Sequence, residues 1–212
     1  MANQICLTCL DREVSFKDTH GQPPKIIPLG EELEFPFSSI ASVSHDFTYV
    51  GSAFLVSSKL VLTAGHVFTQ QNYQSESEFS VSFKGGEVLT EILKIHFHPE
   101  LDLALGVLSD DADMPSFYFG SPLVGQKIIV IGFPSQGFGT QQYYGNGVVK
   151  RIEGDVIVHD ASTRDGHSGS PIILLDKANF VIGVHSEALN GEDENAGLAC
   201  NSEIVSWINS HS

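Results

Sequence analysis

Residues 51–68 read GSAFLVSSKLVLTAGHVF, and this stretch sets the pattern for most of the chain. It contains two runs rich in β-branched and aromatic residues, which favour strands, separated by small polar residues that favour a turn. The second run ends in a small-residue turn that delivers His66 at the mouth of a short helical turn. Similar runs follow at spacings typical of an all-β sandwich or barrel, so we expect an all-β fold.

The apolar runs fall into two groups of about six strands each. The first group covers residues 40–44, 49–57, 60–63, 79–83, 88–97 and 103–108. The second group covers residues 127–131, 142–152, 156–159, 171–175, 181–185 and 197–200. The intervening residues 110–125 contain Pro115, Pro122 and several turn formers, which indicates a connection between the two groups.

The two ends of the chain differ from this pattern. Residues 1–36 are polar and contain four prolines that cannot donate a ladder hydrogen bond, so we expect a surface extension there. In residues 202–212 the apolar side chains recur at helical spacing after Ser202, a residue type that caps helices. We therefore expect a short C-terminal helix, capped by Ser202 and packed on the second group of strands.

Composition excludes several classes of function. The chain has 212 residues and 42% hydrophobic residues, enough for a packed core in one domain or in two similar halves. Its 11 Lys and Arg against 26 Asp and Glu give a net charge of −15, which would repel a phosphate backbone. The longest apolar runs are far shorter than the ~20 residues of a membrane-spanning helix. We expect no nucleic-acid partner and no membrane span.

The cysteines also bear on the environment of the protein. Three cysteines, an odd number, cannot form the disulfide framework expected of many exported animal enzymes, and no basic residue precedes the apolar patch at the start. The sequence therefore predicts a cytoplasmic protein, although excision from a secreted precursor would leave the same appearance. Cys6 and Cys9 form a CxxC, but zinc needs four ligands and the second half of such a site is missing. We expect two ordinary thiols, no metal and no cofactor.

Three segments carry residues with catalytic chemistry. His66 lies near the end of residues 51–68, Asp102 lies in HPELDLALGVL (residues 98–108), and Ser168 lies in DGHSGSPIILL (residues 165–175). A hydroxyl is a poor nucleophile at neutral pH and needs an imidazole base, which in turn needs a third group to orient it. The three residues supply all three roles. The glycines around Ser168 favour close approach of a substrate, and the amides of Gly166 and Ser168 are candidates for an oxyanion hole.

The motifs TAGHV, DLAL and GHSGSP, in the order His, Asp, Ser with gaps of 36 and 66 residues, resemble those of the chymotrypsin-like (trypsin-fold) serine endopeptidases. Bacterial glutamyl endopeptidases and HtrA-type proteases are the most similar branch, because Ser170 stands where animal enzymes have a second Gly before Pro. The resemblance implies two six-stranded antiparallel β-barrels, at residues 37–115 and 116–201, with the active site in the cleft between them. It also implies an endopeptidase that hydrolyses proteins or peptides through an acyl-enzyme.

The same resemblance places the specificity pocket between the segment before Ser168 and residues 181–188, VIGVHSEA. Thr163 and His185 match positions that bind an acidic side chain in glutamyl endopeptidases, and Ser186 is a further candidate for substrate binding. A hydroxyl and an imidazolium can both donate to a carboxylate. We therefore predict cleavage after Glu, with Asp weaker. Against this, Glu187 should emerge on the same face as His185 in an extended strand, and His185 has the alternative role of a hydrogen-bonded core residue.

Other interpretations stay open on the sequence alone. The chain could be a catalytically silent trypsin-like fold that acts as a peptide-binding or regulatory module, and residues 1–36 could dock a regulatory partner. An α/β-hydrolase is excluded, because GHSGS lacks the closing Gly of GxSxG and the Ser follows the His in the chain. His167 departs from the small polar residue common before the nucleophile, and we expect it at the pocket rim or exposed to solvent.

Overall fold

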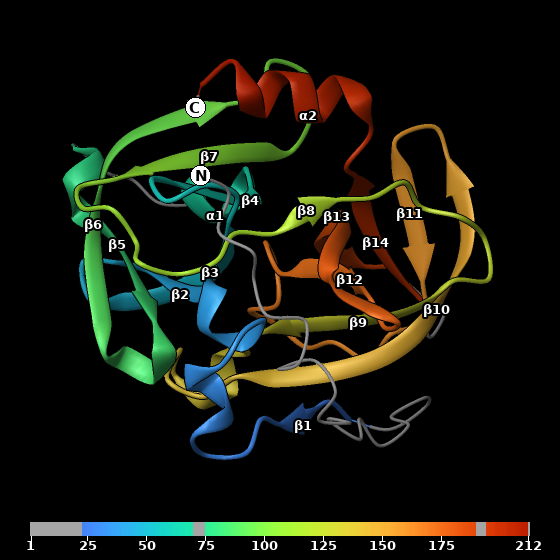
Figure 1. The fold of residues 1–212 in the computed structure, drawn as a ribbon, viewed down its shortest axis with the longest axis horizontal. Helices are drawn as coiled ribbons and strands as arrows, with labels where there is room; N and C mark the ends of the chain where they lie inside the picture. The colour runs from blue at the N-terminus through green and yellow to red at the C-terminus, as the bar shows by residue number, and fades with distance from the viewer. Residues whose placement is uncertain (1–22, 70–74, 190–193, 212) are drawn as a thin grey trace, which may run out of the picture.

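A computed structural model describes residues 23–69, 75–189 and 194–211, and these form two antiparallel β-barrels side by side (Figure 1). The first barrel is closed in the strand order β2-β3-β4-β7-β6-β5. Its strands are β2 (Ile40–His45), β3 (Thr48–Leu55), β4 (Leu60–Ala64), β5 (Phe79–Phe83), β6 (Val88–Phe97) and β7 (Leu103–Leu108). Each of these strands lies within a few residues of its expected range, so the expected first group is confirmed.

The second barrel closes in the order β9-β10-β11-β14-β13-β12, because β9 pairs with both β10 and β12. Its strands are β9 (Lys127–Gly132), β10 (Tyr143–Glu153), β11 (Val156–His159), β12 (Pro171–Leu174), β13 (Lys177–Ala188) and β14 (Asn195–Ala199). Two short strands join its outside, β1 (Lys25–Ile26) on β10 and β8 (Tyr118–Phe119) on β13. The expected all-β fold of two six-stranded barrels is therefore confirmed.

The helices of the described residues are short. Two are α-helices, α1 (His66–Thr69) and α2 (Ser202–Asn209). The 3-10 helices are η2 (Glu31–Leu33), η3 (Phe37–Ser39), η4 (Glu76–Glu78), η5 (Lys84–Gly86) and η6 (Ser135–Gly137). Helix α1 matters most for function, because it carries His66 directly after β4.

Several strands are apolar on both faces because each face meets a different core. In β9, Ile128 and Val130 point into the second barrel, whereas Ile129 and Ile131 join the cluster between the barrels. Burying each such side chain contributes ~1.5–3 kcal/mol. The cluster between the barrels thus holds the two halves together.

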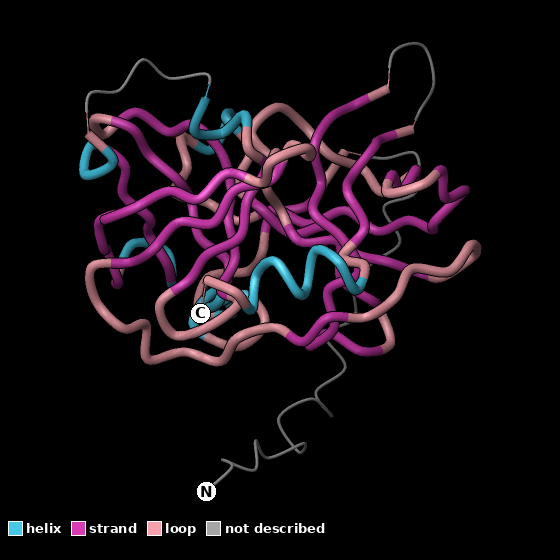
Figure 2. The backbone as a smooth tube through the Cα atoms, turned by 90° about the horizontal axis from the view of Figure 1, so that it is seen from above, coloured by secondary structure: helices cyan, strands magenta, loops and turns pink. Residues whose placement is uncertain are grey.

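The C-terminal helix differs from the expectation in two respects. Its cap is Asn201, whose side chain accepts from the amides of Glu203 and Ile204, each at 3.0 Å, and not Ser202. The helix also lies across the junction of the barrels and not on the second one alone (Figure 2). Trp207 packs edge-on against His98 of the first barrel, with ring centroids 4.9 Å apart. Packing across the junction covers the apolar cluster from above.

Most of residues 23–36 are exposed or half-buried, but the segment is anchored in the core. Ile27 is buried and belongs to the cluster between the barrels, and its amide donates to the Gln142 carbonyl at 2.9 Å. Pairing of the two-residue strand β1 with β10 places Ile27 next to this cluster. A strand of two residues is too short to produce an alternating pattern in the sequence, so it could not be predicted. Cys6 and Cys9 lie outside the described residues.

We predict that Gly169→Ala destabilises the fold strongly. Gly169 has φ +85, and a Cβ there would collide with the Ser52 carbonyl oxygen and the Thr63 hydroxyl. We expect a loss of more than about 3 kcal/mol in the free energy of unfolding, measured by denaturant titration. The control is Gly30→Ala, because Gly30 has φ +95 with nothing within 4 Å and isolates the cost of the backbone angle. Equal losses in the two variants would contradict the close approach of the barrels.

Candidate active site

His66 and Asp102 are brought together by the pairing of two neighbouring strands. Strands β4 and β7 pair with Ala64 opposite Leu103, so the residues just beyond them lie side by side. The Gly65 amide donates to the Asp102 carbonyl at 3.0 Å. An added Cβ at Gly65 would lie 2.9 Å from Asp102 Oδ1, so a glycine is needed for this approach.

The Asp102 carboxylate makes two hydrogen bonds to His66. Oδ1 accepts from the His66 amide at 2.7 Å, and Oδ2 lies 2.6 Å from His66 Nδ1. The second contact favours the tautomer in which Nδ1 carries the proton and Nε2 keeps its lone pair. Burial by itself would raise the pKa of Asp102, but the hydrogen bonds and charge of His66, together with the Ser186 hydroxyl, outweigh it and lower that pKa. Ionised Asp102 is therefore favoured, and its contacts fix the orientation of the His66 ring.

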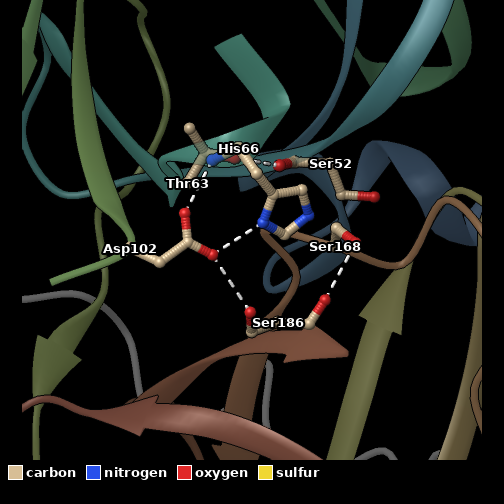
Figure 3. A network of polar contacts seen from close by, with 6 residues as sticks. All are labelled: Ser52, Thr63, His66, Asp102, Ser168 and Ser186. Atoms are coloured by element: carbon tan, nitrogen blue, oxygen red, sulfur yellow. Dashed lines mark hydrogen bonds and ion pairs between the residues drawn. The ribbon is translucent and has the colours of Figure 1, made fainter. Parts of the chain in front are cut away.

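Ser168 lies in a turn between β11 and β12 that is fixed to the first barrel. Its carbonyl accepts from the Ser52 amide of β3 at 2.9 Å, and the next amide, that of Gly169, donates to the His185 carbonyl at 2.8 Å. In Figure 3 the imidazole of His66 lies between the Asp102 carboxylate and Ser168. The Ser168 hydroxyl donates to the Ser186 carbonyl at 2.9 Å and does not contact His66 through a hydrogen bond. The three side chains thus share one site, with the hydroxyl turned toward Ser186.

These side chains line a single cleft of about 850 Å³. The cleft also contains every residue that the sequence placed in the specificity pocket, namely Thr163, His185 and Ser186. Further lining residues that matter below are Arg164, Glu187 and Asn195. All six candidate catalytic and pocket side chains therefore belong to one continuous surface.

Among the described residues, the Gly166 and Ser168 N–H groups expected to form an oxyanion hole have no acceptor. The Asp165 carbonyl accepts from the Ser135 amide at 2.8 Å, and the His167 carbonyl accepts from the Ser170 amide at 2.9 Å. In a trans peptide the N–H points opposite to the C=O, so the Gly166 and Ser168 N–H groups face away from these partners. Within the described residues neither N–H has a protein acceptor. Both remain available to a negatively charged oxygen.

The base of the pocket contains neutral groups. The Thr163 hydroxyl donates to Asn195 Oδ1 at 2.8 Å, and Asn195 Nδ2 donates to the Ala161 carbonyl at 2.9 Å. His185 is 3% exposed, and its Nδ1 lies 3.4 Å from Nε2 of His159. Burial, reinforced by the neighbouring histidines, lowers the pKa of His185 well below its usual value. The expected imidazolium is therefore wrong for the free protein, and the Thr163 proton already has an acceptor.

A β-bulge at Ser186 separates His185 from Glu187. His185 pairs with Gly197 and Glu187 with Ala196, which leaves Ser186 outside the ladder. The bulge interrupts strand alternation, so His185 is buried whereas Glu187 is exposed, and the expectation that both share a face is wrong. No pattern in the sequence predicts such a bulge.

Other site residues were missed or misplaced by sequence reasoning. The Ser186 hydroxyl donates to Asp102 Oδ2 at 3.1 Å, a contact not expected of a pocket residue. Strands β11 and β14 pair with His159 opposite Asn195, and Asn195 lines the cleft whereas His159 is buried against His185. His167, expected at the rim, is fully buried, and its Nδ1 lies 3.1 Å from the Arg164 amide. Only its place directly before Ser168 could have suggested a structural role.

In residues 23–69, 75–189 and 194–211, His, Cys, Asp and Glu side chains form no group of three or more that could hold a metal ion. Cys200 is a buried free thiol. Over the same residues, none of the helices has the length and apolar character needed to span a bilayer.

Comparison with known proteins gives concordant matches. Residues 51–184 match the family model of the trypsin-like peptidase domain. A solved Glu endopeptidase, in complex with MPD, superposes with a TM-score of 0.74 at 19% identity, covering 91% of this chain and 98% of that one. Neuropsin, a serine protease of mouse brain, gives 0.68 at 18% identity, covering 82% and 94%. A mutant of human heparin binding protein gives 0.72 at 14% identity, covering 88% and 94%. At these identities the structures show a shared fold.

We predict that the protein loses stability on mild acidification because of its buried histidines. Burial lowers the pKa values of His159 and His167 to about 4, and that of His185 well below 6.5. Below pH 6.5 these histidines therefore become protonated in the unfolded chain but stay neutral in the folded chain. The free energy of unfolding, which is fully present at neutral pH, falls as the pH drops toward 4. For His159 and His167, lowering the pKa from 6.5 to about 4 corresponds to about 3 kcal/mol of stability each.

Denaturant unfolding between pH 7.5 and 4 measures this loss. His167→Asn should reduce the loss in the free energy of unfolding between pH 7.5 and 4 by about the contribution of one histidine, whatever its effect on stability at pH 7.5. A free energy of unfolding that stays constant from pH 7 to pH 5 would show that these imidazoles are not buried in their neutral form.

Proposed function

The chain belongs to the family of trypsin-like peptidase domains and is a serine protease, and we propose that Ser168 is its nucleophile, with His66 as general base and Asp102 as the group that orients His66. One observation carries this proposal. Both oxygens of Asp102 bind His66, at 2.7 and 2.6 Å, and Ser168 faces the same ring across the cleft (Figure 3). This arrangement leaves His66 Nε2 free to accept a proton.

In the proposed mechanism the Ser168 hydroxyl turns from the Ser186 carbonyl to His66 Nε2. Its oxygen attacks the scissile carbonyl carbon while its proton passes to Nε2, and the carbonyl oxygen becomes an oxyanion. The N–H groups of Gly166 and Ser168 stabilise that oxyanion. His66 then gives the proton to the leaving amine, and a water molecule hydrolyses the acyl-Ser168 ester by the same route. The fully ionised Asp102 stabilises the imidazolium in both steps.

We further propose that the pocket prefers Glu before the scissile bond. The tautomers of the buried histidine pair support this preference. His159 Nδ1 is buried and has no partner within the described residues. A buried donor without an acceptor is rarer in proteins than a buried acceptor without a donor, so the favoured proton position on His159 is Nε2. That proton then points to His185 Nδ1, which leaves His185 with an N–H at Nε2.

His185 thus offers a neutral donor to a cleft that it lines. Asn195 offers a second one, because its Nδ2 carries two N–H groups and Ala161 accepts only one of them. Two donors suit the oxygens of a carboxylate, whereas a Gln side chain would bring an NH₂ group against one of them. Exposed Arg164 adds positive charge at the cleft, and exposed Glu187 lies beyond the bulge. The local donors therefore favour Glu over Gln.

Substitution tests the nucleophile and its base. Ser168→Ala and His66→Ala should abolish turnover, and Asp102→Asn should lower kcat by ~10⁴, as in this class of enzyme. Labelling by a fluorophosphonate, read by mass spectrometry, should occur on Ser168 and vanish in His66→Ala. The exposed Ser58→Ala is a control that should keep full activity. A peptide-binding module without catalysis would bind peptides but resist the label, and turnover retained by Ser168→Ala would refute the assignment.

Cleavage profiling on a mixed peptide library tests the pocket. Glu should dominate before the scissile bond, with Asp and Gln weaker, and His185→Ala should reduce the preference for Glu over an apolar residue by about 10-fold or more. The measurement is kcat/KM on matched peptides that differ only at that residue. If the wild-type profile is not dominated by Glu, the pocket proposal fails while the assignment of Ser168 is unaffected.

A further inference from the structure

Tyr49 of β3 makes contacts that neither the proposed mechanism nor the proposed pocket uses. Its hydroxyl donates toward two carbonyl oxygens, those of Phe133 and Gly166, the latter at 2.5 Å. A single phenol proton is thus shared between the loop after β9 and the turn that carries Ser168. Burial raises the pKa of Tyr49 well above its usual value, so the hydroxyl keeps this proton.

The contact fixes the peptide plane in the middle of the oxyanion turn. The Gly166 carbonyl accepts from Tyr49 and, at 3.1 Å, from the Ser52 hydroxyl, while the His167 amide at the other end of the same peptide donates to the Arg164 carbonyl at 3.0 Å. The peptide planes on either side are held through the Asp165 and Ser170 contacts described above. Three successive planes are therefore constrained, and the central one is constrained by the first barrel.

Gly166 joins two of these peptide planes, and its own backbone angles leave their relative orientation free. It adopts φ +96, and a glycine populates positive and negative φ about equally. The Gly166 N–H shares a peptide plane with the Asp165 carbonyl, which the Ser135 amide holds, and the Gly166 carbonyl lies in the next plane. Holding that carbonyl restricts rotation about the Gly166 bonds and so limits the movement of both planes. The Tyr49 ring also lies close, since an added Cβ at Gly166 would come within 2.9 Å of it. The first barrel thus holds the peptide plane that lies between the planes of the Gly166 and Ser168 N–H groups.

We propose that Tyr49 is a positioning residue for the oxyanion hole: by holding the Gly166 carbonyl, its hydroxyl fixes the peptide plane between the Gly166 and Ser168 N–H groups and so keeps both directed at the oxyanion that forms on the substrate. The proposal rests on the proposed role of Ser168 as nucleophile. Tyr49 does not touch the substrate. Its effect should appear when negative charge develops on the carbonyl oxygen and should be small in the complex with uncharged substrate.

Tyr49→Phe tests the proposal, because it keeps the ring and removes only the hydroxyl. Removing an oxyanion donor outright costs ~10²–10³ in kcat, and a loosened donor should cost less, about 5- to 30-fold, with KM within about 2-fold. Rates are taken per active site, counted by fluorophosphonate labelling. Tyr143→Phe is the matched control, since its hydroxyl lies 3.4 Å from Gln141 Oε1 and away from Gly166, and it should keep wild-type kcat.

A second readout reports on the oxyanion directly. A ¹³C-labelled peptidyl trifluoromethyl ketone, built on the residue that the wild type cleaves after, adds the Ser168 oxygen to its carbonyl and passes the proton to His66. The pKa of the adduct oxygen, titrated by NMR, should rise by about one unit in Tyr49→Phe, in step with a 10-fold loss of stabilisation. A change in folding alone would lower the number of active sites without moving this pKa.

The outcomes separate the two proposals. Wild-type kcat and adduct pKa in Tyr49→Phe would overturn the role of Tyr49, as would a loss confined to KM or to the number of active sites. A wild type that forms neither the adduct nor the fluorophosphonate product would overturn the assignment of Ser168, and the role of Tyr49 with it. If Tyr49→Phe does not fold, Ser52→Ala removes the second contact to the same carbonyl. It should show a smaller loss in kcat, and an unchanged kcat would overturn the proposal.

Discussion

The site depends on the hydrogen bonds by which the first barrel holds the turn that carries Ser168 in the second barrel. The Ser52 amide holds the Ser168 carbonyl at 2.9 Å, and the Ser52 hydroxyl contacts the Gly166 carbonyl and the Phe133 amide at 3.1 and 3.0 Å. His66 and Asp102 belong to the first barrel, whereas Ser168 belongs to the second. Only a rigid junction can keep a hydroxyl and an imidazole from different barrels within reach of each other. The junction requires glycine at position 169, because a Cβ there would collide with Ser52 and Thr63 of the first barrel.

Electrostatics divides the cleft into two regions. Near His66, a partly exposed carboxylate keeps its charge because it receives two hydrogen bonds and a hydroxyl contact. In the pocket, burial favours neutral His159 and His185, so the recognition proposed there depends on donors and not on fixed charge. The acidic surface of the protein is therefore compatible with an acidic substrate residue, since the net charge of −15 acts at long range and is screened by salt.

The sequence predicts the fold and the three candidate catalytic residues because both depend on local patterns. Alternating and continuous apolar runs mark the strands, and Gly-flanked segments mark the turns that carry His66 and Ser168. Contacts made across the junction are not local, so the roles of Tyr49 and Ser186 could not be predicted. The bulge that separates His185 from Glu187 arises from the register of β13 on β14, which no single strand encodes. The same limit explains why His167, assigned to the rim, is instead buried beneath the turn.

The central claim is that Ser168 forms a covalent acyl intermediate with the help of His66. Mass spectrometry of the protein quenched during turnover of a peptide ester tests it most directly. The account predicts a mass increase of one acyl group, located on the peptide that contains Ser168 and missing from His66→Ala. Turnover without any acylated protein, or an acyl group on a different residue, would contradict it.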